Sequence, residues 1–404
     1  MKLIGSAVSL AHAIVDPHRL HLSVGKTPAR RWWFSDNRSQ QAGYRCAVSF
    51  SSTSDINSMR SAINQALSEF VKSENKYLAK IGPELDPVAT AIESFLLDSG
   101  KRLRPLFAYV GLLGAGADAS PEIIKAISSL ELIHVCALIH DDVMDGSDTR
   151  RGSPSIHKLF EKMHTKNQLV GSAPQFGISS AILIGDLALI WSAQMLHTSG
   201  IKNDQLIKSL SVYDEMRVEL MAGQYLDVYE QSLGTQNVER SLKVARYKSG
   251  KYTIQRPLHF GASIAGASNE LITSYTNYGI PLGEAFQLRD DLLGVFGDPS
   301  LTGKPAGDDL REGKRTALIA IAMDRATDVQ LKDLKSNFGD PNLSSEQINL
   351  LQEIIISTGA VSHIESMIKE LTDTSLAALK HGGITPAGIN LLTELAILAT
   401  NRKI

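Results

Sequence analysis

Two acidic pairs, each at the end of an apolar helical run, constrain this chain more than any other feature. The first pair begins at Asp141, and the second, Asp290 and Asp291, follows about 150 residues later. Residues four apart share one face of a helix, so Asp141 and Asp145 are predicted to present their carboxylates side by side. Like charges at this spacing destabilise a bare helix by roughly 0.2–0.5 kcal/mol, a cost that a bound cation removes. The pattern therefore favours long helices that carry a cation site.

Magnesium suits such a pair, because it prefers oxygen ligands and completes its coordination with water and phosphate oxygens. Arg150 and Arg151 follow shortly after Asp145, and guanidinium groups form paired hydrogen bonds with phosphate. The order of charges indicates a metal site followed by a diphosphate site. The alternative is a solvated helix end in which the acids and arginines pair with one another, and the second acidic pair weakens it.

A basic cluster, GKRLRP, lies at residues 100–105. Proline is favoured in the first turn of a helix, so Lys101, Arg102 and Arg104 are predicted to crowd a helix N-terminus. Backbone N–H groups at that end attract anions, whereas cations there are repelled by the helix dipole. The cluster is interpreted as a second phosphate site, with a solvated basic corner as the alternative.

Taken together, these motifs resemble those of the trans-isoprenyl diphosphate synthases, the polyprenyl synthetase family. The similarity spans roughly residues 60 to 400, and its wording is nearest to the actinobacterial type of geranylgeranyl diphosphate synthase. The resemblance implies an all-α fold, a single large helical bundle of the isoprenoid synthase type with two Asp-rich motifs facing each other across a central cavity. It rests on GKRLRP, DDVMD with the RRG that follows, KSGKYT (Lys248–Thr253), FQLRDD (Phe286–Asp291) and GKPAGDDLREGKRT (Gly303–Thr316).

The resemblance also implies a reaction, the head-to-tail (1'-4) condensation of isopentenyl diphosphate with dimethylallyl, geranyl or farnesyl diphosphate. Three Mg²⁺ ions per active site are expected, held by Asp141, Asp145 and Asp290. The expected catalytic residues are these three acids with Arg150 and Lys248. The residues expected to bind the two diphosphates are Lys101, Arg104, His134, Arg150, Arg151, Lys248, Ser249, Gln287, Lys304 and Lys314.

His134 shows what the resemblance adds, because spacing alone would make a histidine in an apolar run a core residue. Two positions depart from the family pattern. Ser249 replaces the usual threonine after Lys248 and keeps its hydroxyl. Gly294 replaces the last acid of the second motif, usually DDxxD, a loss that is tolerable if Asp290 is the direct ligand and the other acids act through water.

Product length is expected to depend on side chains beneath the first motif. Cys136 and Ala137, five and four residues before Asp141, are both small, which leaves room for chains beyond C15. The predicted product is geranylgeranyl diphosphate (C20), with farnesyl and longer polyprenyl diphosphates as alternatives. Two rivals from other classes are a class I terpene cyclase, which has no need of the GKRLRP cluster, and a non-catalytic synthase subunit, which typically loses acidic motifs.

Composition bounds the partners. A formal charge of −2 does not indicate a surface that binds nucleic acid. The two cysteines, Cys46 and Cys136, are too few and too far apart for a disulfide framework or a zinc site. The longest apolar run, Gly177–Trp191, is interrupted by Asp186, so stable membrane insertion is not expected. The resemblance implies a homodimer.

Residues 1–54 differ from the remainder. They contain seven Lys or Arg but only Asp16 and Asp36 as acids, a composition shared by disordered leaders and organelle transit peptides. Residues 55–404 are predicted to form the catalytic domain. The expected location is the cytoplasm, or a plastid or other organelle if the leader is a transit peptide.

Overall fold

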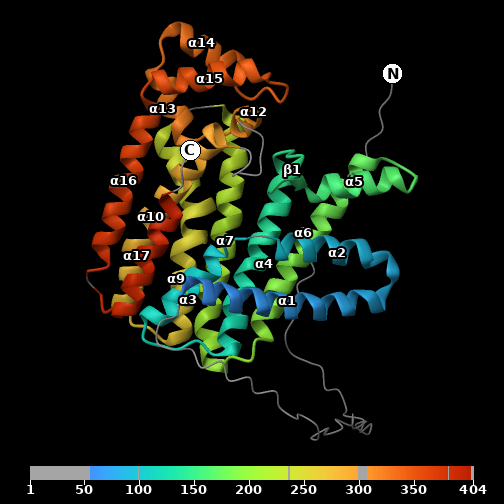
Figure 1. The fold of residues 1–404 in the computed structure, drawn as a ribbon, viewed down its shortest axis with the longest axis vertical. Coiled ribbons are helices and arrows are strands. Elements are labelled where there is room, and N and C mark those ends of the chain that lie inside the picture. Colours follow the sequence, from blue (N-terminus) through green and yellow to red (C-terminus); the bar gives the residue numbers. More distant parts are fainter. Residues whose placement is uncertain (1–54, 99, 235–236, 299–306, 381, 402–404) are drawn as a thin grey trace, which may run out of the picture. The chain divides into compact units, whose positions relative to one another are not determined.

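The computed structural model describes residues 55–98, 100–234, 237–298, 307–380 and 382–401, all within one compact unit, residues 52–404. The expectations for residues 1–54 and for Lys304 therefore lie outside the described residues. The described chain is almost entirely helical (Figure 1), which confirms the predicted all-α fold. It also contains a hairpin of two short strands, β1 (Thr149–Arg150) and β2 (Ser153–Pro154), just after the first acidic motif.

The helices begin and end as follows. The first half contains α1 (Ile56–Ile81), η1 (Pro83–Leu85), α2 (Asp86–Leu97), α3 (Leu103–Gly114), α4 (Pro121–Met144), α5 (Ile156–Lys166), α6 (Ala173–His197) and α7 (Asn203–Leu233). The second half contains α8 (Val238–Val244), η2 (Ala245–Gln255), α9 (Arg256–Ala265), α10 (Asn269–Phe296), α12 (Asp308–Glu312), α13 (Ala317–Arg325), α14 (Asp328–Asn337), α15 (Ser345–Ser357), α16 (Ala360–Ala378) and α17 (Pro386–Thr400).

The helix that carries the second acidic pair, α10, is continuous. Glycine and proline usually weaken or interrupt a helix, yet α10 passes through Gly279, Pro281 and Gly283. The glycines instead permit close packing. A Cβ atom at Gly279 would lie 2.8 Å from Gln255 Cα, and one at Gly283 would overlap Gly250. The absent side chains therefore let α10 and η2 touch backbone to backbone.

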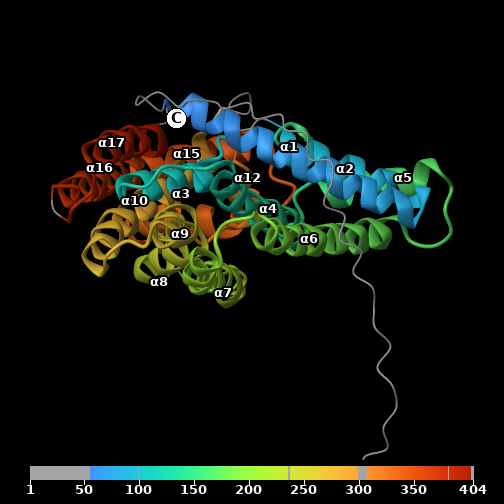
Figure 2. The same ribbon diagram turned by 90° about the horizontal axis from the view of Figure 1, so that it is seen from below.

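Two hydrophobic clusters stabilise the bundle. The larger includes Leu106 of α3 and Ile139 of α4, and the smaller includes Leu318 of α13. The helix α10 belongs to both, because Leu282 lies in the larger cluster and Leu292 in the smaller one. It also packs against α16 and α17 at one side of the bundle (Figure 2). The first acidic motif thus lies against the larger cluster and the second against the smaller one. The helix α10 contributes side chains to both clusters.

By length and composition alone, α4 and α6 could each cross a membrane, a test that buried core helices also pass. The apolar window of α4 is 72% buried inside the bundle, as expected for a core helix. The window of α6 is only 39% buried, and Leu183 and Ile190 are 68% and 61% exposed. The outer face of α6 is therefore an apolar surface of the single chain.

Candidate active site

A cavity of about 900 Å³ lies between the two acidic motifs. Asp141 lines it from α4, and Asp290 and Asp291 line it from α10. The predicted arrangement, two Asp-rich motifs facing one another across a cavity, is therefore confirmed. Of the remaining residues singled out from the sequence, those that also line it are Lys101, Arg102, Arg104, His134, Ala137, Arg150, Arg151, Lys248, Ser249, Gln287, Gly294 and Lys314.

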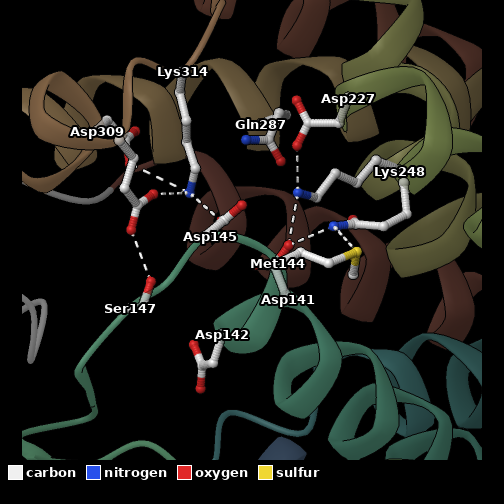
Figure 3. Close-up of polar contacts among 12 residues, drawn as sticks. Asp141, Asp142, Met144, Asp145, Ser147, Asp227, Lys248, Gln287, Asp309 and Lys314 are labelled. Carbon is white, nitrogen blue, oxygen red and sulfur yellow. Dashed lines mark hydrogen bonds and ion pairs between the residues drawn. The ribbon is translucent and has the colours of Figure 1, made fainter. Parts of the chain in front are cut away.

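Asp141 is the centre of a charged network. Its Oδ1 accepts hydrogen bonds from Lys248 Nζ at 2.9 Å and from Gln224 Nε2 at 2.7 Å (Figure 3). Lys248 Nζ also donates to Asp227 Oδ2 at 2.6 Å, so α4, α7 and η2 meet at one ammonium group. Burial alone would raise the pKa of Asp141, but the nearby cations, Lys248 foremost, outweigh it and hold that pKa well below its usual range. Asp141 is therefore a carboxylate at neutral pH.

Asp145 lies one turn further along and does not line the cavity itself. Lys314 Nζ lies 3.2 Å from Asp145 Oδ2, 2.7 Å from Glu312 Oε2 and 3.6 Å from Asp309 Oδ1 (Figure 3). Burial raises the pKa of Asp145 to about 6, although Lys314 opposes the shift. Lys314 thus connects the first acidic motif with the segment that follows the second.

Arg150 reaches the cavity already bound to the first motif. Its Nε donates to Asp142 Oδ1 at 2.9 Å, and Asp142 is fully buried. The turn that follows consists of Arg151 and Gly152, with φ of 53° and 76°, the positive pair of angles typical of a two-residue hairpin loop. The hairpin therefore places both arginines at the cavity wall.

The second motif adds further carboxylates. Gln287 Nε2 donates to Asp291 Oδ1 at 2.7 Å. Burial raises the pKa of Asp291 to about 8, and the nearby carboxylates of Asp309, Asp290 and Asp227 contribute to that shift. Several acids therefore crowd this wall of the cavity.

The donor chemistry of both walls fits magnesium. Mg²⁺ typically takes one or two protein carboxylates and fills its other positions with water and phosphate oxygens. Asp141 on one wall and Asp290 on the other offer such oxygens to one cavity. Among the residues that the structure describes, no three His, Cys, Asp or Glu side chains form a ready-made metal cluster.

A second polar group surrounds Arg104. Arg104 Nη2 donates to Thr253 Oγ1 at 2.9 Å, and its guanidinium lies 4.2 Å from the centre of the Tyr252 ring. His134 Nδ1 is buried and has no hydrogen-bond partner among the described residues, and the buried Tyr252 hydroxyl lies beside Arg104. Burial, followed by Arg104, lowers the pKa of His134 well below its usual value, so its imidazole is neutral. Sequence reasoning missed Tyr252, because its place depends on the π-helical winding of η2, which has no clear sequence signature.

One cation of the basic cluster, Arg102, lines the cavity but is bound to buried partners. Arg102 donates to Glu131 Oε1 at 2.9 Å and to Asn64 Oδ1 at 2.8 Å, and both partners of the ion pair are 2% exposed. It adopts a left-handed conformation with φ of 55°, which costs a non-glycine residue roughly 1 kcal/mol or more. Arg102 therefore fixes the segment that presents Lys101 and Arg104, and its contact with a phosphate stays a prediction.

The two small residues below the first motif occupy different places. Ala137 lines the cavity, whereas Cys136 is fully buried with its Sγ 3.7 Å from His140 Nδ1. His140 in turn lies 3.0 Å from the Ile182 carbonyl oxygen of α6, so the thiol faces α6. Burial raises the pKa of Cys136 to about 12. The structure thus brings Ala137, and not Cys136, to the cavity wall.

Comparisons with known proteins agree with this geometry. The sequence profile of the family described as polyprenyl synthetase matches residues 86–355. The chain is 34% identical over 272 residues to the geranylfarnesyl diphosphate synthase of Aeropyrum pernix, covering 66% of this chain and 79% of that protein. It is 27% identical over 336 residues to the geranylgeranyl pyrophosphate synthase of Geoglobus acetivorans, covering 83% of this chain and 97% of that protein.

Solved structures show the same fold. The geranylgeranyl pyrophosphate synthase of Corynebacterium glutamicum, complexed with isoprenyl diphosphate and magnesium, superposes with a TM-score of 0.84 and is 42% identical. The match covers 87% of this chain and 100% of that chain. The arrangement of helices around the cavity is therefore shared with a protein that binds both a prenyl diphosphate and magnesium.

Proposed function

The chain belongs to the polyprenyl synthetase family, and on that premise we propose that this prenyltransferase makes geranylgeranyl diphosphate (C20). The proposed reaction is the Mg²⁺-dependent head-to-tail (1'-4) condensation of isopentenyl diphosphate with an allylic diphosphate. The observation that carries the proposal is one cavity that holds the carboxylates of both acidic motifs and two separate groups of cations. Relatives named for C20 and for C25 products make geranylfarnesyl diphosphate the leading alternative, ahead of farnesyl and longer products.

The allylic diphosphate is proposed to bind between Asp141 and Asp290, with Asp145 adjacent, where three magnesium ions would be held. When bound, these ions neutralise the charge that develops on the diphosphate as its C1–O bond breaks. Lys248 adds a fixed positive charge, since Asp141 and Asp227 raise its pKa above the ordinary value despite burial. Arg150, Lys314 and, from outside the described residues, Lys304 are proposed to assist it.

Isopentenyl diphosphate is proposed to bind at Lys101, Arg104, His134 and Arg151. His134 precedes Asp141 by seven residues of α4, about 10 Å along the helix axis, so the two diphosphates are held apart with the reacting carbons between them. C4 of isopentenyl diphosphate then bonds to the allylic C1, and its C2 loses a proton. We assign no side-chain base, because the released diphosphate can accept that proton.

The proposal is tested by incubating the purified protein with isopentenyl diphosphate, Mg²⁺ and a C5, C10 or C15 primer. We expect the C20 alcohol after dephosphorylation and chromatography with every primer that is accepted, and no product once EDTA has removed the metal. A cyclic product from a single substrate, or no elongation of any primer, would contradict the proposal.

Chain length gives a second test. Replacing Ala137 with phenylalanine adds a ring to the cavity wall one turn before Asp141, so we expect the main product to shift from C20 to C15. Cys136→Phe is the matched comparison, because its ring must enter the packed layer beside His140. It should lower the stability of the protein and leave the product length largely unchanged. An unchanged product distribution from a folded, active Ala137→Phe variant would rule out this wall as the limit.

The oligomeric state is proposed to be a homodimer in which a second copy covers the outer faces of α6 and α7. Leu183 and Ile190 of α6 are exposed, as are Val218 and Tyr225 of α7, at 67% and 68%. Exposed apolar patches of this kind typically mark interfaces. Light scattering of the purified protein should give twice the mass of one chain.

The location is proposed to be the cytoplasm, with a plastid or another organelle as the alternative if residues 1–54 act as a transit peptide. The buried free thiol of Cys136 suits a reducing compartment.

A further inference from the structure

We propose that Asp309, which reaches the cavity from α12, supplies the carboxylate that the second acidic motif lacks at Gly294. The inference rests on the proposed role of magnesium. It explains why this chain can have glycine at position 294, where the DDxxD pattern has its last acid. Asp309 is proposed to act on the magnesium site through bound water or the other acids, so it does not have to be a direct ligand of the metal.

The first observation is steric. A Cβ atom built on Gly294 would overlap both the Cγ and the Oδ2 atoms of Asp309. Position 294 lies one turn after Asp290 on the same face of α10. The carboxylate of Asp309 therefore occupies the space into which an aspartate at position 294 would extend its side chain.

The second observation is that α12 holds Asp309 in this place. Glycines in the left-handed conformation, Gly307 and Gly313, bracket the helix, each with φ of 68°. The Leu310 side chain is fully buried, and its carbonyl accepts a hydrogen bond from the Gly339 N–H at 2.9 Å. The Asp309 carbonyl accepts one from the Lys314 N–H at 3.0 Å. The position of Asp309 is therefore set by packing and backbone hydrogen bonds.

The third observation concerns charge. Asp309 lines the same cavity as Asp290 and Asp291, and Lys314 Nζ lies between Asp309 Oδ1 and Asp145 Oδ2, at 3.6 and 3.2 Å (Figure 3). Asp309 adds a carboxylate to those of Asp290 and Asp291, at the place where a complete DDxxD motif would have its last acid. This carboxylate comes from a separate helix, and glycine at 294 leaves room for it.

The test measures magnesium binding without turnover. Isothermal titration of Mg²⁺ into the full-length protein with inorganic pyrophosphate should show about tenfold weaker binding for Asp309→Asn. For the rescue, Gly294→Asp is combined with Asp309→Ala, because alanine vacates the space that an aspartate or asparagine at position 309 fills. The double variant returns a carboxylate to that space and should restore most of the affinity lost in Asp309→Ala. Asp324→Asn, on the exposed surface of α13, is the matched control and should bind as the wild type does.

Two outcomes would overturn the inference alone: wild-type affinity in a folded Asp309→Asn variant, or a double variant that binds as weakly as the single one. Asp309→Ser gives the same test should the asparagine disturb the packing near Lys314, and circular dichroism reports folding in each case. Absence of magnesium binding in the wild type would overturn the proposed metal dependence together with this inference.

Discussion

Replacing Asp141 with asparagine is expected to lower the rate of prenyl transfer about a thousandfold, or about 4 kcal/mol of transition-state stabilisation. The amide keeps the size of the side chain but removes the charge that faces Lys248 at 2.9 Å. It also removes a proposed metal ligand, so the charge on the leaving diphosphate is less well neutralised. Product formation from isopentenyl and farnesyl diphosphates at saturating Mg²⁺ measures the effect.

The comparison for this variant is Asp373→Asn on α16, which removes a carboxylate of similar size from an exposed ion pair with Lys369. It should keep wild-type activity. Asp373→Asn should melt as the wild type does, and Asp141→Asn should remain folded, because Lys248 Nζ still donates to Asp227 Oδ2 at 2.6 Å. An Asp141→Asn variant that kept a tenth or more of the wild-type rate would remove Asp141 from the proposed machinery.

Replacing Arg102 with methionine is expected to lower the free energy of unfolding by about 3–5 kcal/mol. The methionine fills much of the space but leaves Glu131, which is 2% exposed, as a buried carboxylate without its ion-pair partner. It also removes donors from Asn64 Oδ1 and from the Leu96 carbonyl, at 2.8 and 2.6 Å. Urea unfolding followed by circular dichroism measures the loss.

A double variant, Arg102→Met with Glu131→Leu, should recover most of that stability, because replacing both partners of a buried pair with apolar side chains is often close to neutral. Lys369→Met breaks an exposed pair instead and should leave the stability close to that of the wild type. If the double variant were less stable than Arg102→Met, the buried charge would not be the cause of the loss.

Much of the cavity could be predicted from sequence because its chemistry is local. The acids at 141, 145 and 290 follow helical spacing, and Ser120 before Pro121 marks the start of α4, where its hydroxyl accepts a hydrogen bond from the Ile123 N–H. The family motifs supplied His134, whose apolar surroundings alone favour a core role. These signals depend on neighbours within one or two turns.

The features that were missed or misread depend on packing between distant segments. A glycine such as Gly283 would by itself suggest a helix interruption, whereas it allows contact with Gly250, 33 residues away in sequence. Nothing in the sequence shows that Arg102, a member of the basic cluster, forms a buried ion pair with Glu131. Asp309 lies within the GKPAGDDLREGKRT motif, but its proximity to Gly294 follows from the tertiary fold alone.

The shared helix α10 has an evolutionary consequence. The part of α10 around Leu282 is embedded in the larger hydrophobic cluster, and the part around Leu292 is embedded in the smaller one. The distance between the two acidic motifs therefore depends on how both clusters pack. Substitutions at remote sites such as Leu318 can shift the helix by fractions of an ångström and alter catalysis without touching substrate. Laboratory selection for new chain lengths should therefore yield mutations whose effects depend strongly on one another, scattered through both layers of the bundle.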